Sequence, residues 1–165
     1  MGRWRPPAAR AAPYITAAGY RRLEAELRAL WVRRNEVVQH LAAAAAEGDR
    51  SENAEYQYRK KELREIDRRI GYLQRRMPQL EIVSERPADD ARVFFGARVE
   101  LEADDGSARA YRIVGADEAE PANGAISLDS PVAQRLLGRA LDDEVELDGL
   151  GAHVIVDIDY PDPRV

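Results

Sequence analysis

Cysteine is absent from this chain of 165 residues, which excludes a disulfide framework, a thiolate metal site and a cysteine nucleophile. No stretch approaches the roughly 20 apolar residues that a membrane helix needs. The only histidines, His40 and His153, fall in a predicted helix and a predicted strand, so neither a metal cluster nor a Ser/His/Asp triad is expected. Glycine-rich phosphate loops and dinucleotide fingerprints are also missing. These absences favour a cytoplasmic protein without a membrane partner.

Charge is abundant and unevenly distributed along the chain. Charged residues make up 33% of the sequence, and the net charge is −5. Residues 1–83 have a net charge of +6, whereas residues 91–165 have a net charge of −9. A basic half joined to an acidic half suggests two partners of different charge, or one partner with two surfaces. The alternative is a solubility bias without a partner.

The first half of the chain repeats apolar residues in alternating steps of three and four. One series runs from Tyr20 to Ala44, interrupted only by Arg34, and a second runs from Leu63 to Leu80. Each series is typical of a coiled coil, in which a helix buries one narrow stripe against a partner. Because few residues separate the two helices, we predict an antiparallel hairpin with arms of ~40–45 Å. The predicted neighbours across it are Leu41 with Tyr56, Leu30 with Ile66, and Leu23 with Leu73.

From about residue 91 the pattern changes to short alternating segments that predict β-strands. Asp105-Gly106 is a hairpin-turn signal, and Pro131 begins a short helix over 132–137. The predicted fold class is therefore α+β, with an N-terminal antiparallel helical hairpin followed by a small, mostly antiparallel β domain with one short helix. The predicted strands are 93–95, 97–103, 108–114, 125–128, 143–147 and 152–158. The predicted organisation is a disordered arginine- and proline-rich tail over 1–13, the hairpin over 14–83, a linker over 84–90 and the β domain over 91–165.

The turn of the predicted hairpin contains two carboxylates three residues apart, Asp49 and Glu52. One interpretation is a capping box, in which Asp49 is the N-cap of the second helix and Glu52 its third residue, stabilising the helix by ~1 kcal/mol. The other is a pair of oxygen ligands on a rigid rod, because Mg²⁺ accepts one or two carboxylates and otherwise keeps water or substrate phosphate. Such a tip lacks the ligands to hold Mg²⁺ alone. The spacing leaves both interpretations open.

The second helix carries basic residues at helical spacing, clear of the apolar stripe. Next to Tyr56 and Tyr58, they could guide a single strand of nucleic acid by charge and base stacking. Interleaved acidic residues also permit local ion pairs such as Glu65–Arg69, so a solvated, salt-bridged face is an equally good interpretation. The residues on this face are Lys61, Arg64, Arg68 and Arg75.

Several stretches of the sequence resemble the bacterial transcript-cleavage factors of the GreA/GreB family. The most specific is GDRSENAEYQYRKKELREIDRRIGYL (48–73), which is similar to the tip and second helix of these factors. Its RSENA, YQY and REIDRR segments, together with VFFGARVEL (93–101), favour the GreB branch. Further matches are YITAAGYRRLEAEL (14–27), YRIVGADE (111–118) and ISLDSPVAQRLLG (126–138). The Ala42–Ala46 run and the extended N-terminus depart from the family pattern.

The resemblance implies an accessory factor of RNA polymerase rather than an enzyme. Such a factor inserts its hairpin into the secondary channel of the polymerase and stimulates the polymerase's own cleavage of backtracked RNA, which rescues arrested complexes. Asp49 and Glu52 match the family's acidic tip residues, which hold a weakly bound Mg²⁺ jointly with the polymerase active site and position the attacking water. We expect a cytoplasmic monomer that binds no Mg²⁺ in isolation.

The resemblance also implies where RNA and polymerase are contacted. The family's basic patch contacts the nascent RNA 3′ end, and the matching region here contains Tyr56, Lys60, Lys61, Arg64 and Arg68. The family's C-terminal domain has an FKBP-like sheet and docks at the mouth of the secondary channel. The matching segment for that docking is Asp129, Ser130 and Pro131.

Three other functions are compatible with parts of this pattern. A channel binder of the same fold could inhibit the polymerase without cleavage, although an intact Asp49/Glu52 pair argues against it. A prolyl isomerase would need an aromatic-lined apolar pocket, for which residues 91–165 provide two phenylalanines, two tyrosines and no tryptophan. A plain coiled-coil scaffold would tolerate neutral residues at the tip.

Overall fold

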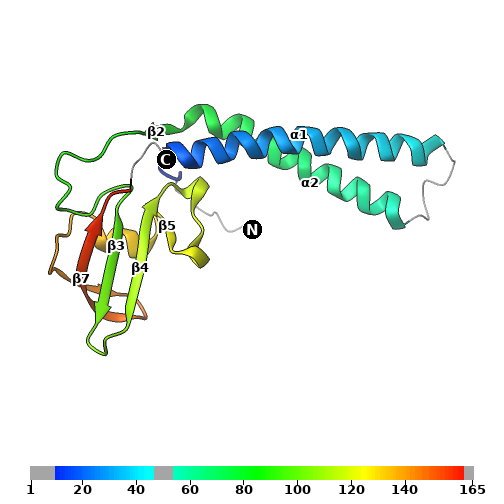
Figure 1. Ribbon diagram of the computed structural model, residues 1–165. Helices are drawn as coiled ribbons and strands as arrows, with labels where there is room; N and C mark the ends of the chain where they lie inside the picture. The colour runs from blue at the N-terminus through cyan, green and yellow to red at the C-terminus, as the bar shows by residue number, and fades with distance from the viewer. Residues whose placement is uncertain (1–9, 47–53, 162–165) are drawn as a thin grey trace, which may run out of the picture. The chain divides into compact units, whose positions relative to one another are not determined.

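The computed structural model describes residues 10–46 and 54–161, which belong to two compact units (Figure 1). One unit is Tyr20–Leu80, and the other combines Met1–Gly19 with Glu81–Val165. Residues 14–19, which were predicted to be part of the hairpin domain, therefore belong to the sheet unit. The expected domain boundaries themselves stay a prediction.

Two long helices, α1 (Ala17–Ala46) and α2 (Ala54–Arg76), form the predicted helical pair (Figure 1). Thr16 caps α1, because its hydroxyl oxygen accepts a hydrogen bond from the Gly19 N–H at 3.0 Å. The α2 helix ends in a single 3₁₀ turn, Met77–Gln79, and Pro78 in this turn cannot continue an α-helix.

The seam between α1 and α2 follows the predicted heptad positions. Val37, Ile66 and Ile70 are buried there, and four leucines pack against them. Two of the predicted neighbour pairs agree with the structure in part, since Leu30 packs against the cluster that contains Ile66, and Leu41 and Tyr56 line one hollow. The third pair stays a prediction, although both of its leucines are buried. The four leucines are Leu27, Leu30, Leu41 and Leu63.

The second unit contains a five-stranded sheet in the order β5-β4-β3-β7-β6. Its neighbours are antiparallel except for β4 and β5, which run parallel, so the sheet is mixed. Asp105-Gly106 forms the predicted turn between β3 and β4, with Gly106 at a φ of 79°. The strands are β3 (Arg98–Ala103), β4 (Ala108–Val114), β5 (Ala125–Ser127), β6 (Glu144–Leu147) and β7 (Gly151–Asp159).

The short helix α3 (Pro131–Leu136) packs its buried side against the sheet. Ala133 and Leu136 are fully buried and belong to the same cluster as Val99, Leu101 and Ile155 of the strands. Strand residues alternate between this cluster and solvent, as a sheet covered on one face requires. The helix begins one residue before the predicted start, because Pro131 takes the first helical position behind its cap.

Two features of this unit were not predicted. Strands β1 (Tyr14–Thr16) and β2 (Glu81–Val83) form a small parallel pair, although more than sixty residues separate them. The predicted strand 93–95 was wrong. Val93 lies in a loop, where its N–H donates to the Arg139 carbonyl and its carbonyl accepts from the Gly138 N–H. Among the described residues, the nearest β-bridge joins Arg92 to Ala140. Short segments like these depend on distant partners, so periodicity alone does not identify them.

The end of the expected N-terminal tail is also ordered. The Ala12 N–H donates to Asp129 at 2.8 Å, and the Pro13 carbonyl accepts from the Glu81 N–H at 2.7 Å. The disordered tail predicted over 1–13 is therefore wrong for these two residues. Residues 1–9 lie outside the described residues.

A buried carboxylate, Glu118, holds the start of α1 against the loop after β4. Its Oε1 accepts from the N–H groups of Thr16 and Gly115 at 2.8 and 3.0 Å, and its Oε2 accepts from the Thr16 hydroxyl at 2.6 Å. Gly19 permits this approach, because a Cβ there would lie 1.9 Å from Glu118 Oε2. A charge buried with several donors is stable in the interior, whereas an unpaired one is not.

Candidate functional site

The tip of the hairpin, where Asp49 and Glu52 were predicted to act, lies outside the described residues. The structure describes the two arms that lead to it, α1 up to Ala46 and α2 from Ala54. The hairpin arms carry most of the other predicted site residues, and their polar contacts decide which cations are available for a partner.

Ion pairs across the seam join the two arms. Arg69 binds Glu26 through two hydrogen bonds of 2.6 and 2.9 Å, and Arg33 donates to Glu62 at 2.7 Å. Arg34, the one polar residue in the seam, donates to Asp67 at 2.6 Å. These contacts favour an antiparallel arrangement, because a later residue on α1 pairs with an earlier residue on α2.

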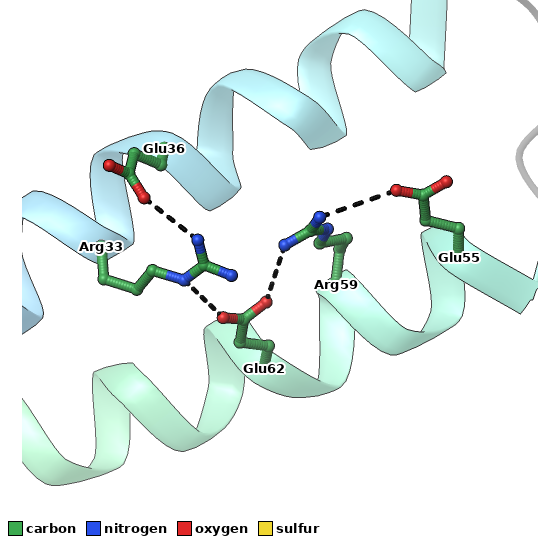
Figure 2. A network of polar contacts seen from close by, with 5 residues as sticks. All are labelled: Arg33, Glu36, Glu55, Arg59 and Glu62. Carbon is green, nitrogen blue, oxygen red and sulfur yellow. Dashed lines mark hydrogen bonds and ion pairs between the residues drawn. The ribbon is translucent and has the colours of Figure 1, made fainter.

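Figure 2 shows that the contact around Glu62 is part of a longer chain of alternating charge. Glu62 accepts from Arg33 on α1 and also from Arg59 on its own helix, at 3.3 Å. Arg33 reaches Glu36, and Arg59 lies 3.6 Å from Glu55, in the first turn of α2. The hydrogen bond from Arg33 holds the pKa of the Glu62 carboxyl below its usual range, and Arg69 does the same for Glu26.

The predicted RNA-contacting cations are not used in these pairs. Lys60, Arg64 and Arg68 are exposed, and none has a hydrogen bond or ion pair with another described residue. Lys61 has one loose contact, 3.9 Å to Glu65, and its side chain is 71% exposed. At 100° per residue Lys61, Arg64 and Arg68 lie opposite the seam, and Lys60 lies to one side of it. They form a stripe of available positive charge, which suits a phosphate backbone.

The tyrosines near the start of α2 occupy different environments. Tyr56 is half-buried and lines a hollow of about 200 Å³ with His40, Leu41 and Arg59. Tyr58 is 64% exposed and lies closer to solvent than the predicted Tyr56. The sequence already indicated this difference. Tyr58 lies two residues after Tyr56, and two residues turn a helix by about half a turn, so Tyr58 points away from the seam. Tyr58 is therefore the better-placed aromatic for stacking on a base.

The predicted docking residues lie at the start of α3, in the sheet unit. Asp129 is exposed, and its carboxylate accepts from the Ala12 N–H. Ser130 is the N-cap of α3, with its hydroxyl accepting from the Ala133 N–H at 3.2 Å, and Pro131 is exposed at the first helical position. The segment is thus a rigid corner that presents one carboxylate and one proline ring at the surface.

Neither a metal centre nor a membrane segment is present in the described ranges. No three histidine, aspartate or glutamate side chains within residues 10–46 and 54–161 cluster as metal ligands. Over the same ranges, no helix combines the length and the apolar content that crossing a bilayer requires. His153 is buried in the sheet unit with its Nδ1 3.0 Å from the Gly151 carbonyl, which is a packing role.

Almost the entire chain matches known proteins. Residues 13–82 match the family model described as transcription elongation factor, N-terminal, and residues 88–160 match transcription elongation factor, GreA/GreB, C-term. Transcription elongation factor GreB of Xanthomonas axonopodis pv. citri (strain 306) is 55% identical, over 97% of this chain and 98% of that protein. GreB of Pseudomonas aeruginosa is 52% identical, over 98% of each. Among solved structures, the GreA factor homolog 1 (Gfh1) of Thermus thermophilus is 26% identical with a TM-score of 0.42, over 88% of this chain and 97% of that one.

Proposed function

The chain belongs to the GreA/GreB family of transcription elongation factors, and from this premise we propose that it is a transcript-cleavage factor of the GreB type. It inserts its hairpin into the secondary channel of RNA polymerase and stimulates the polymerase's own cleavage of backtracked RNA. The observation that supports this most strongly is identity above one half with proteins named GreB over nearly their whole length. The protein is an accessory factor, and the polymerase remains the catalyst.

Asp49 and Glu52 supply the chemistry that the polymerase lacks. Their donor set fits Mg²⁺, which takes one or two carboxylates and fills its remaining positions with water or phosphate oxygen. A metal held there jointly with the polymerase would complete a two-metal site with ions about 4 Å apart. The role of the tip is to bring two negative charges to that point and to orient a water toward the scissile phosphate.

The outer face of α2 faces the RNA in this proposal. Lys60, Arg64 and Arg68 support it because they are exposed and have no partner among the described residues. Lys61 and the exposed Tyr58 extend this surface, where charge attracts the phosphates and an aromatic ring stacks on a base. Tyr56 is half-buried, so its contact with RNA is the weaker of the two tyrosine proposals. The exposed corner at Asp129 and Pro131 contacts the polymerase at the channel mouth, and the acidic net charge of residues 91–165 favours a basic surface there.

The decisive experiment replaces the tip carboxylates by amides. Asp49→Asn and Glu52→Gln keep side-chain size, and asparagine is itself a good N-cap. Cleavage in a backtracked elongation complex should fall by orders of magnitude, with each factor of ten equal to ~1.4 kcal/mol in the barrier. Glu65→Gln is the matched control, because it makes the same change on an exposed carboxylate of α2 and should leave cleavage near wild type.

Melting temperature and polymerase affinity are measured on the same variants, and both should stay close to wild type. If cleavage survives the two amide substitutions, or falls only in proportion to lost stability, the carboxylates are helix caps and the proposal fails. Purified protein incubated with naked RNA and Mg²⁺ should show no cleavage. Specific cleavage without polymerase would instead identify a nuclease.

A further inference from the structure

One flank of the helical hairpin carries two ion pairs of opposite polarity, which we call the ionic flank. Its first pair joins Glu26 of α1 to Arg69 of α2, and its second joins Arg33 of α1 to Glu62 of α2 (Figure 2 shows the second). On each helix the two members are seven residues apart, so they lie on the same side of the seam. The acidic partner is on α1 in the first pair and on α2 in the second.

This alternation of polarity distinguishes the native register from its nearest competitors. The apolar seam repeats every heptad, so sliding α2 by seven residues still places apolar residues opposite one another. The charges do not match at both positions after a slip. A slip in one direction places Arg33 opposite Arg69, although it also brings Glu26 opposite Arg76. A slip in the other direction places Glu26 opposite Glu62, although it also brings Arg33 opposite Glu55. Each slip therefore replaces two ion pairs with one opposite-charge contact and one like-charge contact.

A third contact strengthens this selection. Arg34 occupies a seam position, where a polar residue lowers stability but specifies register if it has one good partner. Its partner is Asp67, at 2.6 Å. After a one-heptad slip Asp67 would have moved by about 10 Å, and Arg34 would face Gln74 in one direction and Lys60 in the other. The seam and its flank together thus encode one alignment of the two helices.

We propose that the ionic flank and the Arg34–Asp67 pair are positioning residues, which set how far the tip carboxylates project from the hairpin. The consequence for cleavage rests on the proposed function. A one-heptad slip moves α2 by about 10 Å along α1. The two ions of a two-metal site are only about 4 Å apart. A slipped hairpin would therefore present Asp49 and Glu52 outside the range in which they serve the polymerase.

A charge exchange within α2 tests this without changing composition. The double variant Glu62→Arg/Arg69→Glu puts like charges at both native pairs and makes both one-heptad slips attractive. The matched control is the quadruple variant Glu26→Arg/Arg33→Glu/Glu62→Arg/Arg69→Glu, which restores opposite charges in the native register. Net charge is the same in wild type and both variants. Any difference between the variants therefore comes from the pairing.

The register is read directly with spin labels on Val32→Cys and Tyr58→Cys, two exposed positions in a chain that has no native cysteine. We expect the label distance to shift or broaden in the double variant and to return to the wild-type value in the quadruple variant. In the unlabelled variants, which keep Val32 and Tyr58, cleavage of backtracked RNA should fall at least ~10-fold in the double variant and stay within about threefold of wild type in the quadruple variant. Loss of helical circular dichroism in the double variant alone gives the same support.

Wild-type distance and cleavage in the double variant would overturn the proposal, as would a quadruple variant that behaves like the double one. The label distances need no polymerase. If the wild-type protein fails to stimulate cleavage, the proposed function fails while the distances still decide whether these residues set the register.

Discussion

The two units of the molecule are stabilised by different interactions. The sheet unit has a buried cluster of twelve residues under one face of its sheet. The described part of the hairpin unit buries six apolar residues, and three of them form a cluster along a narrow seam. The hairpin adds partly exposed ion pairs, and such pairs contribute little stability but prefer one geometry. Apolar burial therefore stabilises the sheet unit, whereas ion pairs in the hairpin favour one alignment of α1 and α2.

This difference assigns separate tasks to apolar burial and to charge. Burial in the sheet unit holds the exposed corner at Asp129 and Pro131 in place. Charge on the hairpin acts in two directions, since the arginines of the ionic flank face the other helix while Lys60, Arg64 and Arg68 face solvent. Substitutions that remove a buried apolar side chain or a charged pair in each unit should show which interaction stabilises that unit.

The largest expected effect on stability comes from truncating a leucine in the sheet unit. Leu101→Ala removes a fully buried side chain and should lower the free energy of unfolding by about 2–5 kcal/mol. Leu41→Ala makes the same chemical change in the hairpin, where the side chain is only half-buried, and should cost less. Urea titration of both variants measures the difference. An equal cost would show that the seam carries as much packing energy as the sheet core.

The sequence predicted the hairpin more completely than the sheet unit, for a physical reason. Heptad spacing is a local pattern repeated many times, so the two long helices and the apolar seam that joins them followed from it. The paired strands β1 and β2 contain three residues each, and their partners lie far apart in the chain. The strand expected at 93–95 carried the right alternation but uses loop contacts instead.

The candidate site was predictable to a similar degree. The spacing of Lys61, Arg64 and Arg68 indicated a common exposed face, which the structure has. The spacing placed Arg59 and Arg69 off this face, but it did not show which acidic residues along and across the seam they pair with. Glu118 was missed altogether, since a buried carboxylate is indistinguishable in sequence from a surface one until its donors are known.

An intermediate effect on the free energy of unfolding is expected from substituting Glu118. Glu118→Ala would leave the Thr16 N–H and the Gly115 N–H buried without their acceptor, and each unsatisfied donor costs about 1–3 kcal/mol. Because water can enter the space left by the side chain and satisfy part of these donors, we expect a loss of unfolding free energy of about 1–3 kcal/mol, at or below that of Leu101→Ala and above that of any hairpin ion pair. Thr16→Ser is the control, because serine keeps the hydroxyl that caps α1 and should stay near wild type. A loss below ~0.5 kcal/mol for Glu118→Ala would contradict this.

The smallest expected effect is the pH dependence of the ionic flank. The pKa values of Glu26 and Glu62 are lowered in the folded hairpin by hydrogen bonds from Arg69 and Arg33. The folded protein therefore binds protons less readily than the unfolded chain, whose carboxyl pKa is near the ordinary 4.5. The stabilisation is fully present above that pH and is lost as pH falls through the folded pKa. Since the pairs are partly exposed, each should contribute less than about 1 kcal/mol. Glu62→Gln should therefore lower the urea midpoint slightly at pH 7, and its difference from wild type should vanish as both are acidified below the lowered pKa of Glu62. A difference that persists unchanged into acid would show that Glu62 stabilises the hairpin by packing rather than by charge.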